Sequence, residues 1–248
     1  MNVCFVSDVG KVRKVNEDAG GVFYNRANQM LTIIADGMGG HKAGDIASDL
    51  TSNHLKDSWE ETDAFESTDE AEKWLIDSIQ QTNQHVYEYA QGNQECVGMG
   101  TTVVATVYFD DNVVVAHVGD SRLYHVKKDE VIQITEDHSF VQQLVNNGEL
   151  TEEEAEAHPK KNVLLQAIGT DQNIRIDVNK FEWSNSDYVL SCSDGLSNKL
   201  STQDILDVLN MDISVEEKVS NLVSIANENG GEDNISVVLV QRKAGESK

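Results

Sequence analysis

The chain has 248 residues, 39% of them hydrophobic and 25% charged, with a single proline. These values are typical of an ordinary globular protein, and no proline-rich linker divides it. The 43 acidic against 19 basic side chains leave a formal charge of −24, which disfavours binding to nucleic acid or to an anionic membrane. The acidic excess either serves solubility alone or includes clusters that hold divalent cations.

Neither a disulfide framework nor a targeting segment is indicated. The cysteines Cys4, Cys96 and Cys192 are odd in number, widely spaced and without a CxxC pair. The first ten residues, MNVCFVSDVG, lack the basic segment and long apolar run of a signal peptide. No apolar stretch approaches the ~18 residues that a membrane span needs. We therefore expect a cytoplasmic protein.

The predicted elements follow in chain order. Apolar runs predict strands at 3–7, 31–35, 101–109, 112–118, 188–192 and 235–240. Helical spacing predicts helices at 43–57, 69–90, around 205–209 and around 219–226. Residues 174–179 alternate, with Ile174, Ile176 and Val178 on one side, which predicts a half-buried strand. The turn residues at 110–112 are typical of a hairpin.

Helices that arrive in pairs between blocks of strands favour an α+β fold over strict alternation of strand and helix. One segment, 148–172, holds an acidic cluster, the only proline and two lysines. We expect it to be an exposed excursion between elements, either a lid or a surface loop.

Four aspartates lie at the ends of apolar runs: Asp36, Asp120 and Asp194 follow such runs, and Asp233 precedes one. A single case is typical of a turn, but an acid at the end of a buried strand is costly to desolvate unless its charge is compensated. The glycine after Asp36 and after Asp194 lets a carboxylate and a backbone carbonyl point at the same spot. Such oxygen ligands, without a histidine or cysteine cluster, suit Mg²⁺ or Mn²⁺. Two such ions about 3.5–4 Å apart can activate a water for phosphoryl displacement.

Motifs for other hydrolytic or phosphate chemistry are absent. The glycine cluster after Asp36 lacks the GxxxxGK[ST] pattern of a phosphate-binding loop, and no GxGxxG follows a strand. HExxH and GxSxG are missing, and no cysteine has an arginine six positions later. Arg13 is a candidate phosphate ligand because its guanidinium fork matches phosphate geometry, although a surface arginine paired with an acid explains it equally well.

Six segments resemble, in order, the motifs of the metal-dependent serine/threonine protein phosphatases, the PPM or protein phosphatase 2C family. They are SDVGKVRKVNEDA (7–19), ADGMGGHKAGDIAS (35–48), MGTTVVA (99–105), VAHVGDSRLY (115–124), LSCSDGLS (190–197) and GGEDNISVVLV (230–240). DGMGG and EDHSFVQQLV make the chain similar to compact bacterial members. The resemblance implies a single domain, 1–248, with two antiparallel β-sheets in a sandwich flanked by pairs of helices, four αββα layers in all. It makes 148–172 a flap beside the site.

Carried over position by position, the resemblance implies a dinuclear centre of Mn²⁺ or Mg²⁺. Asp36 would bridge the two ions, and the carbonyl of Gly37 would bind the second. Asp194 and Asp233 would hold the first ion. Asp120, together with Asp194, would contribute to a third, weaker site.

The resemblance also implies roles beside the ions. Glu17, which we count with the metal set, and Asp18, which we count with the catalytic residues, would orient metal-bound waters. Arg13 falls where the family places its phosphate-binding arginine. Animal relatives carry a histidine, the proposed general acid, where this chain has Met38, which cannot donate a proton. His41 is the nearby candidate for that role, although it is equally well explained as a solvent-exposed histidine at a helix start. Metal-bound water is another candidate acid.

The implied activity is hydrolysis of phosphoserine and phosphothreonine in proteins by a hydroxide between the two ions. The expected partners are phosphorylated proteins, including a cognate bacterial serine/threonine kinase, and the chain is expected to be a monomer. Two rival functions are a scaffold without activity and a hydrolase of small phosphoesters or nucleotides. The retained acids disfavour the first rival, and the charge of −24 disfavours polyanionic substrates of the second.

Overall fold

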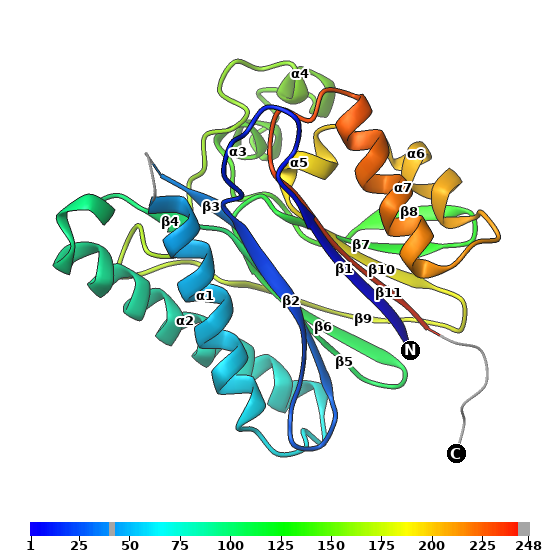
Figure 1. The fold of residues 1–248 in the computed structure, drawn as a ribbon, viewed down its shortest axis with the longest axis horizontal. Coiled ribbons are helices and arrows are strands. Elements are labelled where there is room, and N and C mark those ends of the chain that lie inside the picture. Colours follow the sequence, from blue (N-terminus) through cyan, green and yellow to red (C-terminus); the bar gives the residue numbers. More distant parts are fainter. Residues whose placement is uncertain (40–42, 243–248) are drawn as a thin grey trace.

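Two antiparallel sheets lie face to face at the centre of the molecule (Figure 1). The computed structural model describes residues 1–39 and 43–242. The first sheet has the order β1 (Asn2–Asp8), β11 (Ile235–Gln241), β10 (Tyr188–Cys192), β7 (Arg122–Lys127), β8 (Glu130–Gln133). The second has the order β2 (Asp18–Tyr24), β3 (Met30–Met38), β5 (Val103–Tyr108), β6 (Asn112–Val118), β9 (Asp177–Glu182), and β4 (Gly100–Thr101) pairs with β3.

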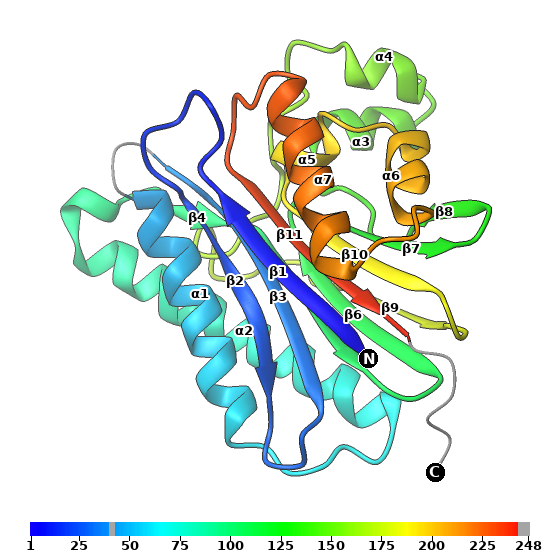
Figure 2. The same ribbon diagram turned by 45° about the vertical axis from the view of Figure 1, so that its right-hand side comes forward.

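Helices cover the outer face of each sheet, so the molecule has four layers (Figures 1 and 2). The pair α1 (Ala43–Glu60) and α2 (Thr68–Gly92) covers the second sheet, and the pair α6 (Thr202–Leu209) and α7 (Val215–Glu228) covers the first. The shorter helices are η1 (Gln94–Cys96), α3 (Phe140–Asn146), α4 (Glu152–Glu156) and α5 (Asp194–Ser197). The expected α+β sandwich in αββα layers is confirmed.

The central strands are buried on both faces, which explains why their sequences are almost continuously apolar. In β5, Val103 and Val107 face α1 and α2, whereas Val104 and Tyr108 face the other sheet. A separate apolar cluster lies between the first sheet and the helices α6 and α7. Because side chains alternate along a strand, each strand contributes to two of these layers at once.

Most predicted strands are confirmed to within a few residues, namely those at 3–7, 31–35, 112–118, 188–192 and 235–240. The predicted run 101–109 is divided into β4 and β5 at Thr102, whose N–H donates to the Asp36 carbonyl at 2.9 Å. The hairpin turn is confirmed, since the Phe109 N–H donates to the Asn112 carbonyl at 2.8 Å.

The strand predicted at 174–179 was placed too early. It begins at Asp177, which pairs with His117 of β6, and residues 174–176 precede the paired stretch. Ile174, Ile176 and Val178 nevertheless pack against one apolar cluster, as their alternation predicted.

Three strands were not predicted: β2, β7 and β8. In β2 the pattern is interrupted by Gly20 and Gly21, which are poor strand formers. Glycine is required at Gly20 because a Cβ there would lie 2.2 Å from the carbonyl oxygen of Ile33 on the paired strand. The close approach of two backbones therefore hides this strand from a reading based on hydrophobic pattern.

The predicted helices are all present, and most helices begin at a hydroxyl side chain. The hydroxyl accepts a hydrogen bond from a backbone N–H of the first turn, which satisfies a donor that the helix itself leaves free. The capping residues are Ser67, Ser139, Thr151, Ser201 and Ser214.

The segment 148–172 leaves the body of the protein beyond α3 and returns to it at Ala167 and Ile168, which are buried. Between α3 and Ala167, residues 151–163 are exposed except for the buried Ala155 and the half-buried His158. Its function as a flap stays a prediction. Within the described residues, no helix combines the length and apolar character needed to cross a membrane.

Trp59 of α1 offers a test of the outer helical layer. Its side chain is fully buried and packs against Phe65 and Trp74, with ring centroids 5.5 and 4.9 Å away. Replacing Trp59 by Ala is expected to lower the free energy of unfolding by about 3–5 kcal/mol, because it leaves a large cavity. Urea unfolding measures this, with Val97→Ala, at an exposed position, as control. A loss below about 1 kcal/mol would contradict this packing.

Candidate metal centre

Aspartates from both sheets meet at one end of the sandwich. Asp18 begins β2 and lies directly opposite Asp36, near the end of β3. Asp194 follows β10, and Asp233 precedes β11 in the other sheet. Asp120 lies just beyond β6. Asp18, Asp36 and Asp194 each influence the pKa of another acid in this set, so the predicted acids do converge.

Burial and mutual repulsion raise the pKa values of these acids. Burial raises the pKa of Asp18 to about 7. Hydrogen bonds from serines oppose this rise, and the charges of Asp194 and Asp233 add to it. Burial and the charge of Asp194 raise the pKa of Asp120 to about 8. Burial, followed by the neighbouring aspartates, raises the pKa of Asp36 well above its usual range. Positive charge among the carboxylates is what would stabilise their ionised forms.

The oxygen atoms present fit divalent cations. Asp18 accepts a hydrogen bond from the Ser193 hydroxyl at 2.8 Å through Oδ2, whereas its buried Oδ1 has no hydrogen-bond partner. A buried oxygen without a donor is costly unless a cation or a water compensates it. The set offers carboxylate oxygens, which are the ligands that Mg²⁺ and Mn²⁺ prefer.

The backbone at Gly37 is packed too closely for any side chain. A Cβ there would lie 2.2 Å from the Gly44 carbonyl oxygen and 2.4 Å from that of Glu17. The Gly37 N–H donates to the same Glu17 carbonyl at 3.1 Å. The glycine therefore joins the end of β3, the start of α1 and the segment before β2, and holds Asp36 beside Asp18.

Asp36 is held through its backbone by the segment that contains β4. Its N–H donates to the Thr102 hydroxyl at 2.9 Å, and its carbonyl accepts from the Thr102 N–H and the Thr101 hydroxyl at 2.9 and 2.8 Å. The Thr102 hydroxyl is also 2.7 Å from that of Ser121, next to Asp120. These contacts leave the Asp36 carboxylate free to face the other acids.

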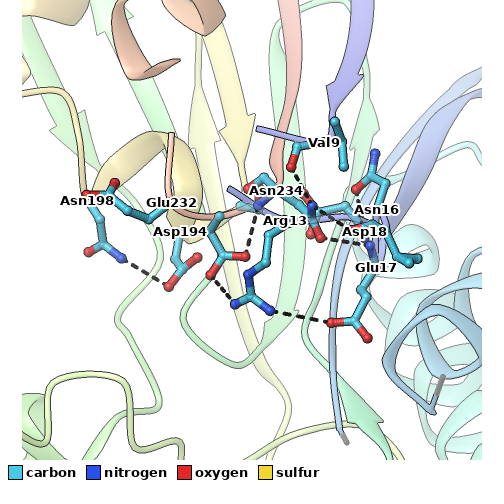
Figure 3. A network of polar contacts seen from close by, with 12 residues as sticks. Val9, Arg13, Asn16, Glu17, Asp18, Asp194, Asn198, Glu232 and Asn234 are labelled. Carbon is cyan, nitrogen blue, oxygen red and sulfur yellow. Dashed lines mark hydrogen bonds and ion pairs between the residues drawn. The ribbon is translucent and has the colours of Figure 1, made fainter. Parts of the chain in front are cut away.

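Arg13 lies at the solvent edge of the centre (Figure 3). Its Nη2 donates to Oδ2 of Asp233 at 2.9 Å, and its Nη1 is 3.8 Å from Oε2 of Glu17. Burial and the charges of Asp45 and Asp233 raise the pKa of Glu17, and Arg13 opposes them. With its side chain 46% exposed, the guanidinium can reach a group that arrives from solvent.

Amide side chains, which the sequence analysis did not identify, support this network. Asn234 accepts the Glu17 N–H at 2.8 Å and donates to the carbonyls of Val9 and Val15 at 2.9 and 3.0 Å (Figure 3). Asn198 donates to Oδ2 of Asp194 at 3.0 Å. The only sequence signal for Asn234 was its place beside Asp233 within the GGEDNIS segment.

The structure thus brings together all but one of the predicted site residues: Arg13, Glu17, Asp18, Asp36, Gly37, Asp120, Asp194 and Asp233. The prediction for His41 lies outside the described residues. Met38, which replaces the histidine of animal relatives, is the last residue of β3 and half-buried.

A family profile described as protein phosphatase 2C matches residues 11–239 of the chain. The chain belongs to the protein phosphatase 2C family. The serine/threonine phosphatase stp of Listeria monocytogenes serovar 1/2a is 43% identical over 242 residues, 98% of this chain and 96% of the relative. Protein phosphatase PhpP of Streptococcus pneumoniae is 39% identical over 240 residues, 97% of each chain.

A solved structure supports the same assignment. The crystal structure of serine/threonine phosphatase Stp1 from Staphylococcus aureus superimposes with a TM-score of 0.95 at 40% identity, over 98% of this chain and 95% of that one. The protein is a serine/threonine protein phosphatase, as its motifs implied.

The raised pKa values predict how the metal-free phosphatase responds to pH. The folded-state pKa values of Asp18 and Asp120, about 7 and about 8, exceed the ordinary value of about 3.9 for an unfolded chain. The folded state therefore binds more protons, and its stability is expected to fall as pH rises from about 5 to 8. The slope is about 1.4 kcal/mol per pH unit for each extra proton.

Urea unfolding in the presence of a chelator between pH 5 and pH 8 measures this slope. Asp120→Asn should make it shallower by about one proton, whereas Asp129→Asn, at an exposed position, should leave it unchanged. Saturating Mn²⁺ should flatten it, because bound cations keep the acids ionised. Stability that rises with pH in chelator would contradict the assignment of these acids.

Proposed function

We propose that this phosphatase hydrolyses phosphoserine and phosphothreonine in proteins with divalent cations, Mn²⁺ or Mg²⁺, in the acidic centre. The observation that supports this most directly is the convergence of half-buried aspartates whose ionised forms repel one another. Among the described residues, Arg122 lowers the pKa values of Asp120 and Asp194, yet the pKa values of both stay above the ordinary value. The acids therefore suit cations that come from solution.

We assign the ligands as the family resemblance implies. Asp36, the Gly37 carbonyl, Asp194 and Asp233 would hold two cations. Asp120 with Asp194 would hold a third, weaker one. Cations bound there supply Lewis-acid activation of water and neutralise charge on the phosphoryl oxygens.

The remaining groups act on water, phosphate and proton. Arg13 exchanges its carboxylate partners for the substrate phosphate, which its fork can bind through two N–H groups. Glu17 and Asp18 accept hydrogen bonds from water beside the cations. Because Met38 cannot donate a proton, His41 stays our candidate to protonate the leaving oxygen.

The partners follow from the same chemistry. The phosphatase relatives imply phosphorylated proteins as substrates, and we propose that a cognate serine/threonine kinase is among them. The retained acids disfavour an inactive scaffold, and the charge of −24 disfavours nucleotides. The monomeric state and the cytoplasmic location stay predictions.

Removal of one ligand charge tests the centre. Asp36→Asn and Asp233→Asn are each expected to lower kcat on a phosphothreonine peptide or on p-nitrophenyl phosphate by at least about 100-fold. Circular dichroism should show an unchanged fold. The control is Asp110→Asn, an exposed acid in the β5–β6 turn, which should keep wild-type activity. Near-normal turnover in either ligand variant would refute the assignment.

Arg13→Ala separates phosphate binding from metal binding. Loss of a charge-assisted hydrogen-bond donor is expected to raise KM for a phosphopeptide about tenfold or more, with a smaller change in kcat. The matched control is Lys14→Ala, the exposed neighbouring cation. If both variants raise KM equally, Arg13 acts only through general charge. If neither does, it does not bind the phosphate.

A further inference from the structure

A four-residue segment, Thr135 to His138, forms hydrogen bonds with the end of β6 and with the turn that carries Asp120. Each of its residues holds a different part of the stretch 117–123. The contacts are Leu123 N–H to Thr135 Oγ1 (2.9 Å), His117 Nε2 to the Glu136 carbonyl (2.8 Å), Arg122 Nε and Nη2 to Asp137 (2.9 and 2.8 Å), and His138 with Gly119. Residues 136–138 of the segment open the stretch EDHSFVQQLV, to which the proposed mechanism gives no role.

His138 forms hydrogen bonds with both the carbonyl and the N–H of Gly119. Its backbone N–H donates to the Gly119 carbonyl at 2.9 Å, and its ring Nδ1 accepts the Gly119 N–H at 3.2 Å. Gly119 has φ +106°, which favours glycine, and a Cβ there would lie 2.6 Å from the side chain of Thr102. His138 therefore fixes the two peptide groups that directly precede Asp120.

The imidazole of His138 belongs to a buried group with His117 and Asp177. The two rings are stacked with centroids 4.7 Å apart, and His138 Nε2 lies 3.3 Å from Oδ2 of Asp177. His117 and Asp177 are directly opposite each other in the β6–β9 pair. The ligand atoms of the three residues lie within 4.8 Å of one another, which is close enough for a transition-metal ion.

The hydrogen bonds favour a proton over a metal ion at this place. His138 Nδ1 accepts from the Gly119 N–H, so the neutral ring carries its proton on Nε2, the atom that a metal would need. His117 donates from Nε2 to a carbonyl, so its buried Nδ1 is a free acceptor. The carboxylate of Asp177, whose Oδ2 lies 3.3 Å away, favours the proton on His138 Nε2. It thereby keeps the lone pair of Nδ1 directed at Gly119.

The same residue is tied to the segment 148–172. The His138 carbonyl accepts the Leu165 N–H at 2.8 Å, and the next residue, Ser139, forms a β-bridge with Leu164. One side therefore faces the return of the predicted flap and the other faces the turn before Asp120.

We propose that His138 is a positioning residue, whose neutral imidazole holds the Gly119 peptide and so aims the Asp120 carboxylate at the weak third cation. The inference rests on the proposed function, because it is that proposal which assigns a cation to Asp120. Its consequence is specific: loss of the Nδ1 acceptor weakens the third cation and leaves the two tighter ones in place.

Two amide substitutions separate the two ends of the imidazole. In His138→Asn, Oδ1 lies near the position of Nδ1 and can still accept the Gly119 N–H. In His138→Gln, the amide reaches toward Asp177 but offers no acceptor at that position. Mn²⁺ binding is measured by the electron paramagnetic resonance signal of free Mn²⁺, with thermal unfolding as the check on folding.

We expect His138→Gln to weaken the weakest Mn²⁺ binding event by about tenfold or more, as for other residues that orient a ligand. His138→Asn should stay within about threefold of wild type. Asp120→Asn should abolish the event, and His138→Gln added to it should change nothing further, because both act on one site. Equal losses in the two amide variants, an unchanged event in His138→Gln, or no weak event in wild type would each overturn the proposal.

Two further measurements address the cases that the amide variants leave open. If His138→Gln does not fold, Asp177→Asn replaces it: weakening of the same event beyond the roughly threefold range allowed for His138→Asn supports the proposal, and a change within that range overturns it. If wild-type protein binds one more Zn²⁺ per chain than His117→Asn, the group is a metal site and the positioning role is wrong. Wild type that binds Mn²⁺ as expected but hydrolyses no phosphopeptide refutes the proposed function alone.

Discussion

Repulsion among half-buried carboxylates is the constraint on which the rest of this structure depends. Asp18, Asp36, Asp120 and Asp194 come from the ends of different strands. Burial is the largest cause of the raised pKa of each, and the charge of Asp194 adds to the rise at the other three. An apolar sandwich gains nothing from such a cluster, because each ionised acid costs free energy when it leaves water. The burial of apolar residues in three clusters holds the strand ends together against that repulsion. Cations among the carboxylates would make the electrostatic free energy of the cluster favourable. This is the simplest explanation for a fold that retains the arrangement.

The neutral groups around the acids support the same conclusion. Ser193 and Asn198 each bind one oxygen of an aspartate, Asp18 and Asp194 respectively, and neither brings a charge. They orient the carboxylates and leave the opposing oxygens available, as the unpartnered Oδ1 of Asp18 illustrates. Arg13, by contrast, pairs with Asp233 from the solvent side. It is therefore placed where a phosphate can compete for its donors without disturbing the buried part of the cluster.

The sequence predicted the parts of this centre that leave a local pattern. An aspartate at the end of an apolar run is visible without any structure, so Asp36, Asp194 and Asp233 were identified from the residues themselves. The same patterns predicted the helices and most strands. What was missed depends on distant contacts: β2 needs Gly20 against Ile33, and Asn234 acts on the backbone of Glu17, 217 residues away. The segment 135–138 has neither periodicity nor a motif with known chemistry, and only its contacts give it a role.

The acidity of the whole chain defines what this centre can accept. With a formal charge of −24, the protein repels anions at long range, although salt screens this field beyond about 8 Å at physiological ionic strength. Attraction for a phosphate group must therefore be local. Under the proposed function it would come from cations held by the aspartates and from Arg13 in the exposed loop before β2. A single phosphate on a protein side chain can use both at short distance, whereas a polyanion also meets the surrounding acids. The net charge that disfavours nucleic acid and polyanions is thus compatible with the proposed substrate, a protein side chain that carries a single phosphate.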